Sequence, residues 1–353
     1  MSQKDGNPSD GPERGAMDQL SAHLDRGWDL VHRGDFEGAR RSAEKSVEID
    51  GEAPEAHNLL GYVSAVLGDS ETALEHYRQA IALDESFIEA MLNAAEVLIH
   101  PVHDFDAAIA LIDEALDWAE GPDEIADAML LKFDAYAHRG DDEAARRVLK
   151  TLPELSDADG RVSFMVGRAY FEIGDLAAAR KHLGRAVELD GEQADPRYYL
   201  AMTLDGLEQR DEATVEFLRC RELDLAAPRA RWALTTQQFE RRVRAAIEQL
   251  EPPLKAVLDG ALVVVVDAPG AEVVAEGVDP RAAILLDARS STPGEARAGR
   301  AFIYQRNIER LCEDSSVLEE ELVESLRAEI GATFPALAPP PATPAADGGD
   351  ACH

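Results

Sequence analysis

The sequence has few cysteines and no long hydrophobic run. Its three cysteines, Cys220, Cys312 and Cys352, are an odd number at wide spacing in 353 residues. They form neither a disulfide framework nor a Cys-pair metal motif, which indicates a reducing compartment, and we expect the cytoplasm. No apolar stretch approaches the roughly 18 residues of a membrane-spanning helix, and the polar N-terminus lacks the apolar segment of a secretory signal.

Basic residues are scarce relative to acidic ones. Lys and Arg total 35 against 69 Asp and Glu, so the formal net charge is −34. This charge repels phosphate, which argues against nucleic acid and against an anionic membrane surface as partners. The acidic residues are spread along the chain rather than gathered in a tail. We therefore assign them chiefly to a solvated surface, with a basic partner as the alternative.

Familiar signatures of catalysis and cofactor binding are also missing. The sequence contains no G-x-S-x-G nucleophile elbow, no phosphate-cradling glycine loop and no Cys/His dyad. Aromatic residues make up only 6% of the chain, whereas hydrophobic residues reach 45%. This balance suits helices packed through Ala and Leu, and it predicts a mainly α-helical protein. From the missing motifs we expect no cofactor.

What the sequence does contain is a repeat of about 34 residues. Its clearest copy is 54–84, which predicts two short helices joined by a turn at Gly68-Asp69. Small residues, Gly61, Ala73 and Ala80, recur where the two helices must approach closely. A helix pair of this length cannot bury its apolar face alone, so it requires a neighbouring pair on each side.

Five further copies share the small residues, the turn or the closing Leu-Asp. The first places Gly34-Asp35 at the turn, and the third has its turn at Asp104 after a one-residue insertion near His100 and His103. The sixth has lost the turn glycine at Glu208. The copies after the second span about 88–119, 123–152, 160–190 and one further period ending at Asp224.

These residues resemble the tetratricopeptide repeat (TPR) family over about 18–226. The resemblance implies an α-solenoid of about six helix pairs, whose concave wall is formed by the first helix of each pair. It predicts a superhelix over residues 17–228, preceded by a disordered N-terminus at 1–16.

Composition changes after Pro228 and predicts a small α+β domain at 229–337, followed by a disordered Pro/Ala/Gly-rich tail at 338–353. An amphipathic helix is expected at 229–250. The β-branched run LVVVV at 262–266 predicts a strand buried on both faces. Two more strands, 283–286 and 301–304, and two more helices, 305–312 and 316–332, complete the domain.

This second domain resembles the minimal zincin-like metallopeptidases that are common in bacteria. The resemblance runs through 239–243, the VVVVDAP strand and 302–312 to a last helix, where the family carries the zinc motif H-E-I-G-H-H-F. Here the sequence reads A-E-I-G-A-T-F, so Glu329 is kept while alanine stands at both histidine positions, Ala328 and Ala332. The fold class expected from both resemblances is therefore a TPR solenoid followed by a degenerate zincin-like domain.

The substitutions remove the chemistry of that motif. Two histidines one helical turn apart can share a Zn²⁺ ion, and the glutamate between them serves as base to the metal-bound water. Alanine has no lone pair, and between Ile330 and Ala346 there is no His, Asp, Glu or Cys. We therefore expect no metal, no catalytic residue and no enzyme activity, and interpret Glu329 as a surface or helix-end carboxylate. The pairs His100/His103 and Cys352/His353 are interpreted as a solvated turn and a disordered end.

The concave face of the repeats is the remaining candidate site. Positions carried over from the TPR resemblance mix aromatic side chains with acids and an arginine, and could hold a peptide. They are Leu24, Trp28, Asn58, Tyr62, Leu92, Glu96, Asp134, Phe164, Arg168, Phe171, Tyr198 and Met202.

The sequence thus predicts a cytoplasmic protein–protein interaction scaffold, which binds an unidentified and possibly basic protein or peptide. Two alternatives stay open. One is a hydrolase with a non-standard site around Glu329, and the other is an acidic, chaperone-like holdase.

Overall fold

The computed structural model describes residues 12–154, 160–288 and 296–337. These form two compact units, one ending at Asp190 and the other beginning at Gly191. The first helix begins at Pro12, so residues 12–16 are helical and not part of a disordered N-terminus. The rest of that expected segment and the tail at 338–353 lie outside the described residues. Within the described ranges, no helix combines the length and apolarity of a membrane span.

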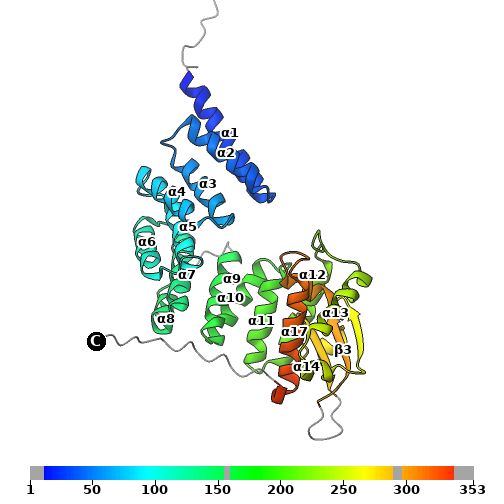
Figure 1. Ribbon diagram of the computed structural model, residues 1–353. Coiled ribbons are helices and arrows are strands. Elements are labelled where there is room, and N and C mark those ends of the chain that lie inside the picture. The colour runs from blue at the N-terminus through cyan, green and yellow to red at the C-terminus, as the bar shows by residue number, and fades with distance from the viewer. Residues whose placement is uncertain (1–11, 155–159, 289–295, 338–353) are drawn as a thin grey trace, which may run out of the picture. The chain divides into compact units, whose positions relative to one another are not determined.

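The first unit consists of five helix pairs (Figure 1). Each pair packs against the next, as the repeat pattern predicts. The pairs are α1 (Pro12–His32) with α2 (Phe36–Ile49), α3 (Pro54–Val66) with α4 (Ser70–Leu83), α5 (Ile88–Ile99) with α6 (Phe105–Trp118), α7 (Pro122–His138) with α8 (Asp142–Lys150), and α9 (Gly160–Glu172) with α10 (Leu176–Leu189).

The turn between the helices of a pair explains the Gly-Asp signature. Gly34, Gly68, Gly140 and Gly174 all adopt positive φ, between 75° and 84°, which glycine reaches without steric cost. The aspartate that follows is the N-cap of the second helix, and its carboxylate accepts a hydrogen bond from a backbone N–H of the first turn. In the third pair His103 takes the left-handed position with φ 60°, and Asp104 is the cap.

Small residues allow the two helices of a pair to approach. A Cβ on Gly61 would lie 2.7 Å from the Tyr77 ring, and a Cβ on Gly167 would lie 2.7 Å from Leu183 Cγ. Ala39, Ala73, Ala108 and other alanines at equivalent positions are fully buried. The repeat pattern therefore encodes a continuous series of helix–helix contacts.

The second unit contains the sixth pair and the α+β part. The pair is α11 (Ala194–Gly206) and α12 (Arg210–Ala226), with Glu208 at φ 63° where the glycine was lost. The other helices are α13 (Thr236–Gln249), α14 (Pro252–Val257), α15 (Ala271–Ala275), α16 (Gln305–Leu311), α17 (Leu318–Thr333) and the short 3₁₀ helix η1 (Pro335–Leu337).

Three strands, β1 (Leu262–Val266), β2 (Ile284–Ala288) and β3 (Ala298–Tyr304), form a mixed sheet in the order β1-β3-β2. β3 is parallel to β1 and antiparallel to β2. Ala301 and Ile303 of β3 belong to the same core as Phe239 of α13 and Leu326 of α17. The predicted mainly α fold with a small α+β part is therefore confirmed.

Three details differ from the sequence prediction. α13 begins at Thr236 rather than near Arg229, because Thr235 and Gln238 form a capping box there. Pro252 and Pro253 begin α14 instead of only ending the preceding helix. The run LVVVV is an edge strand, with Leu262 62% exposed, and not a strand buried on both faces.

Candidate functional site

The first helices of the pairs form a continuous wall in the first unit. α1 contacts α3, α3 contacts α5, α5 contacts α7, and α7 contacts α9. Because the second helices do not interrupt these contacts, side chains on one face of α3, α5, α7 and α9 share a surface. This surface corresponds to the wall that the tetratricopeptide resemblance predicts to be concave.

A cavity of about 330 Å³ opens on this wall between α5, α7 and α9. Its lining combines apolar side chains with four carboxylates and two arginines. The charged residues are Glu96 of α5, Asp127 and Asp134 of α7, and Arg161, Arg168 and Glu172 of α9. The apolar lining includes Leu92, Leu130, Phe133 and Met165. We call this the α5–α7–α9 groove.

The groove has an acid excess that its arginines only partly offset. Arg161 binds Asp127 with two hydrogen bonds, of 3.2 and 2.8 Å, and Arg168 Nε lies 3.2 Å from Glu172 Oε1. Burial raises the pKa of Asp134, and the nearby Arg168 and His138 only partly oppose this effect. Burial also raises the pKa of Glu172. Both carboxyl groups would therefore gain from a further positive charge.

Four of the sequence-predicted residues meet in this groove, namely Leu92, Glu96, Asp134 and Arg168. Phe164 and Phe171 lie on the same helix as Arg168 and are partly buried. Asn93, Asp127, Arg161 and Glu172 were missed. Asn93 and Glu172 adjoin a predicted position, and Arg161 lies about one helical turn from Phe164, so widening these predicted faces would have included them. Asp127 lies about two turns before Asp134, the position predicted on α7, and widening that face by one turn would have missed it.

Other predicted residues are engaged elsewhere. Asn58 is 2% exposed; its amide donates to Glu89, and its carbonyl accepts from Asn93, both at 3.1 Å. The rings of Trp28 and Tyr62 pack against each other at a tilt of 58°, with centroids 5.3 Å apart, and Leu24 packs against the core of the first two pairs.

Tyr198 and Met202 are on α11, in the second unit. The Tyr198 hydroxyl donates to Asp279 at 2.8 Å, and the Arg281 guanidinium lies 4.5 Å from its ring centroid. Tyr198 therefore contributes to packing within that unit.

The helix that resembles the zinc helix is α17, and it carries Ala328 and Ala332 on its exposed surface. Glu329 is half-buried and not a surface carboxylate, because it accepts hydrogen bonds from the backbone N–H of Leu286 at 3.0 Å and from Thr333 at 3.3 Å. Burial raises its pKa above 4.5. Its carboxylate thus satisfies an N–H of the edge strand β2.

Histidines offer little as metal ligands in the described ranges. His103 Nδ1 donates to the carbonyl of Ile99 at 3.1 Å, and the His100 ring packs edge-on against His138. The described residues contain no group of three or more His, Cys, Asp or Glu side chains with metal-binding geometry. Cys352 and His353 lie outside the described residues.

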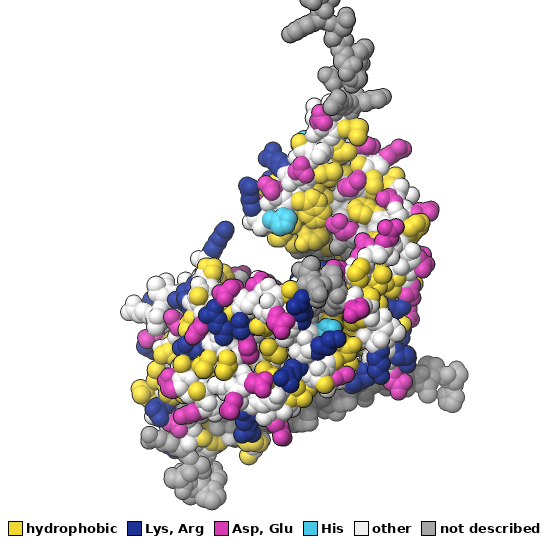
Figure 2. Space-filling view, turned by 180° about the vertical axis from the view of Figure 1, so that it is seen from behind, with side chains coloured by type: hydrophobic (Ala, Val, Ile, Leu, Met, Phe, Trp, Pro, Cys, Tyr) yellow, Lys and Arg dark blue, Asp and Glu magenta, His cyan; other side chains and the backbone are white. Residues whose placement is uncertain are grey.

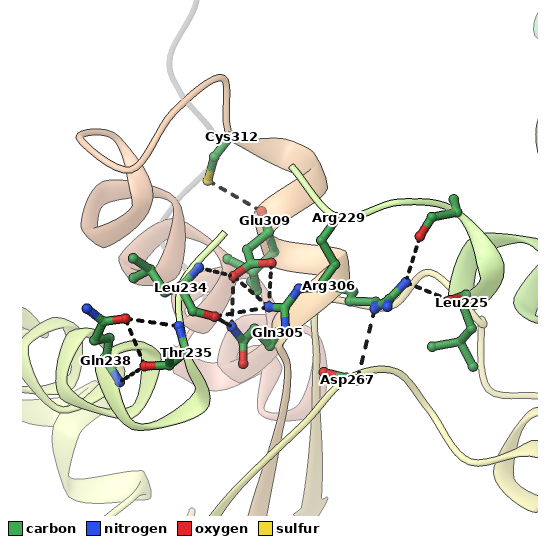
Figure 3. A network of polar contacts seen from close by, with 12 residues as sticks. Leu225, Arg229, Leu234, Thr235, Gln238, Asp267, Gln305, Arg306, Glu309 and Cys312 are labelled. Atoms are coloured by element: carbon green, nitrogen blue, oxygen red, sulfur yellow. Dashed lines mark hydrogen bonds and ion pairs between the residues drawn. The ribbon is translucent and has the colours of Figure 1, made fainter. Parts of the chain in front are cut away.

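The second unit has its own polar centre at Glu309 (Figure 3). This side chain is only 5% exposed. Its carboxylate accepts from Arg229 at 2.8 and 3.0 Å, from the backbone N–H of Leu234 at 3.1 Å, and from Gln305 at 2.7 Å. Both carboxylate oxygens are thus hydrogen-bonded within the second unit, so we assign Glu309 a structural role.

Comparison with known proteins agrees with the repeat assignment. The tetratricopeptide repeat family model matches residues 24–86, and a second tetratricopeptide repeat model matches residues 160–193. No curated protein matches the sequence.

Among solved structures, PilF of Pseudomonas aeruginosa is 20% identical with a TM-score of 0.49; the match covers 59% of this chain and 93% of PilF. TTC0263, a TPR protein of Thermus thermophilus, is 20% identical with a TM-score of 0.44, over 52% of this chain and 98% of that one. YrrB, a TPR protein with an unusual peptide-binding site, is 21% identical with a TM-score of 0.37, over 51% and 91%. These similarities are too low to transfer a function. The family matches and the helix pairs together establish that the chain contains tetratricopeptide repeats.

Proposed function

We propose that this protein is an interaction scaffold that binds a peptide segment of its partner in the α5–α7–α9 groove. The observation that carries the proposal is the convergence of Leu92, Glu96, Asp134 and Arg168 on one cavity of about 330 Å³. Apolar side chains of a bound segment would cover Leu92 and its neighbours. The charged side chains of the groove would fix the register in which the segment binds.

The groove favours a basic segment. Its lining has four carboxylates and two arginines, and both arginines already contact acids of the lining. A lysine or arginine of the partner near Asp134 and Glu172 would offset the cost of their burial. Since the pKa of both carboxyl groups is raised, binding should strengthen as the pH rises and the two groups ionise.

A peptide display library selected on the full chain tests this function. We expect enrichment of Lys- or Arg-containing segments, and the selected peptides should bind Asp134→Asn about tenfold more weakly. Glu44→Gln removes the same charge from the exposed face of α2 and should leave the affinity unchanged. Equal affinities for the wild type and both variants would refute the assignment of the groove.

We further propose that the α+β part is a metal-free, zincin-like module without peptidase activity, in a cytoplasmic protein. Supporting this, Ala328 and Ala332 offer no ligand atoms, and Glu329 is hydrogen-bonded to Leu286 and Thr333. Cys220 and Cys312 are both buried, free thiols, as a reducing compartment would maintain.

Metal analysis after dialysis and a casein cleavage assay with added Zn²⁺ test this second proposal. We expect no retained metal and no cleavage. Stoichiometric zinc would contradict the metal-free assignment, and cleavage that Glu329→Gln abolishes would instead establish a hydrolase. Salt-sensitive capture of unfolded basic proteins that Asp134→Asn does not affect would point to a holdase.

A further inference from the structure

A second cavity, of about 230 Å³, lies within the second unit where the C-terminal end of α12 meets α16. Four arginines line it, against only two acids. The arginines are Arg221, Arg229, Arg306 and Arg310, and the acids are Asp224 and Glu309. A local excess of positive charge is unexpected in a chain with a formal net charge of −34. We call this cavity the arginine pocket.

Two of the four arginines are neutralised by the pocket's own acids. Arg229 binds Glu309 at 2.8 Å, and Arg310 Nη1 lies 3.0 Å from Asp224 Oδ2. Asp224 also binds Arg281, at 2.9 Å. Burial opposes ionisation of Asp224, but its hydrogen bonds to Arg281 and Arg310 outweigh burial and hold its pKa below 3.8.

The other two arginines lack a carboxylate at hydrogen-bond distance among the described residues. Arg221 Nε donates to the carbonyl of Pro269. One terminal nitrogen of Arg306 donates to the carbonyls of Asp224, Leu225 and Ala227, at 3.2, 2.8 and 3.2 Å. Its Nε is buried with no acceptor in the described part of the chain, and the Asp267 carboxylate is 4.0 Å away. Figure 3 shows Arg306 with Leu225 and Asp267, beside Arg229 and Glu309.

A buried guanidinium N–H without an acceptor is costly. Arg221 has no carboxylate partner among the described residues, and Arg306 has only the longer ion pair to Asp267, so their positive charge in a partly enclosed cavity attracts an anion. The planar fork of arginine matches the oxygens of a phosphate or a carboxylate. The rest of the lining is largely apolar and includes Leu225, Ala227, Pro228, Ala268 and Pro280. The cavity volume suits a ligand of a few to about ten non-hydrogen atoms.

We propose that the arginine pocket binds a small oxyanion, a phosphate or carboxylate group carried on a short apolar stem, with Arg221 and Arg306 as its ligands. The competing explanation is purely structural, in which Arg306 only stabilises the carbonyl end of α12. That explanation leaves Arg221 its hydrogen bond to the Pro269 carbonyl and predicts no saturable anion binding.

Calorimetric titration of the full chain distinguishes the two explanations. The probes are inorganic phosphate, phenyl phosphate and hexanoate, at ionic strength held constant with chloride. We expect saturable binding of at least one probe that carries a stem, tighter than inorganic phosphate. Tighter binding of phenyl phosphate identifies a phosphoryl ligand, and tighter binding of hexanoate identifies a carboxylate.

Arg221→Gln should weaken that binding about tenfold while the protein stays folded, because Arg221 makes a single backbone hydrogen bond. Arg244→Gln is the matched control, since this arginine of α13 is exposed. Arg306→Gln should also weaken binding, but it can disturb the end of α12, so Arg221→Gln decides. The proposal fails if no probe saturates, or if Arg221→Gln binds like the wild type.

Discussion

The five N-terminal helix pairs and the α+β part of the second unit are stabilised in different ways. The pairs repeat one local solution, with a left-handed turn residue, a capping aspartate and a small residue at the helix crossing. The α+β part depends on single contacts that occur once, such as Glu309 with Arg229 and Glu329 with Leu286. The helix pairs can therefore be recognised in the sequence by their periodicity, whereas the single contacts of the α+β part leave no repeating pattern.

Charge on the surface differs from charge in the enclosed cavities. Acidic and basic side chains are interspersed over the face shown in Figure 2, and the acid excess is not confined to one patch. Function is therefore better sought in enclosed sites, where charges are few and partly desolvated, than in the net charge of the surface. The α5–α7–α9 groove and the arginine pocket are two such sites, with opposite charge balance.

The largest expected effect is at Glu309. Replacing it with alanine leaves Arg229 and the Leu234 N–H without their buried acceptor, and should cost about 3–5 kcal/mol of the unfolding free energy of the second unit. Hydrogen exchange in α16 measures this effect locally and separates it from the repeats. Glu313→Ala, at an exposed site nearby, should change little. If both variants had a similarly small effect, the α+β part would not depend on the contacts of Glu309.

A smaller effect is expected at the helix crossings. Gly167→Ala places a Cβ 2.7 Å from Leu183 Cγ and 2.9 Å from its backbone nitrogen, and should destabilise the fifth pair by about 1–3 kcal/mol. Gly184→Ala, on α10, meets no described atom within 4 Å and should stabilise by about 0.5–1 kcal/mol. Urea unfolding followed by hydrogen exchange in α9 and α10 measures both. Equal effects of the two substitutions would show that close approach does not explain the glycine positions.

Glu329→Gln should cost about 1 kcal/mol or less, because the amide keeps an acceptor oxygen for the Leu286 N–H. The pKa of Glu329 is raised on folding, so the folded state binds its proton more tightly than the unfolded state does. The wild type should therefore lose stability as the pH rises through about 4.5 and above, and Glu329→Gln should lose less. Thermal unfolding across this range measures the difference, and identical pH profiles would contradict the assigned burial.

The smallest effect is expected at His76 of α4, whose Nδ1 lies 3.4 Å from His57 Nδ1. Burial, and then the charge of His57, lower the pKa of His76 below 6.5. The unfolded state therefore takes up a proton first, and the second pair should lose a little stability as the pH falls through about 6.5. His76→Gln should reduce this loss, whereas His32→Gln, at an exposed site, should not. Hydrogen exchange in α3 and α4 checks the prediction.

Much of the fold could be predicted from the sequence, because Gly68-Asp69, Gly61 and their counterparts recur at a fixed interval. Part of the groove could be predicted from the same repeat interval, because Leu92, Glu96, Asp134 and Arg168 occupy equivalent faces of their helices. The exposure of Leu262 could not be predicted, because the order of strands depends on long-range pairing. Nor could the roles of Asn58 and Glu309, whose partners lie about 31 and 80 residues away in the chain.

Titration of a selected basic peptide into the full chain, with cleavage followed in the same samples, tests the central claim most directly. We expect the peptide to stay intact, its binding to weaken about tenfold with Asp134→Asn, and no change with Glu329→Gln. Affinity unaffected by Asp134→Asn, or peptide cleavage that Glu329→Gln abolishes, would contradict it.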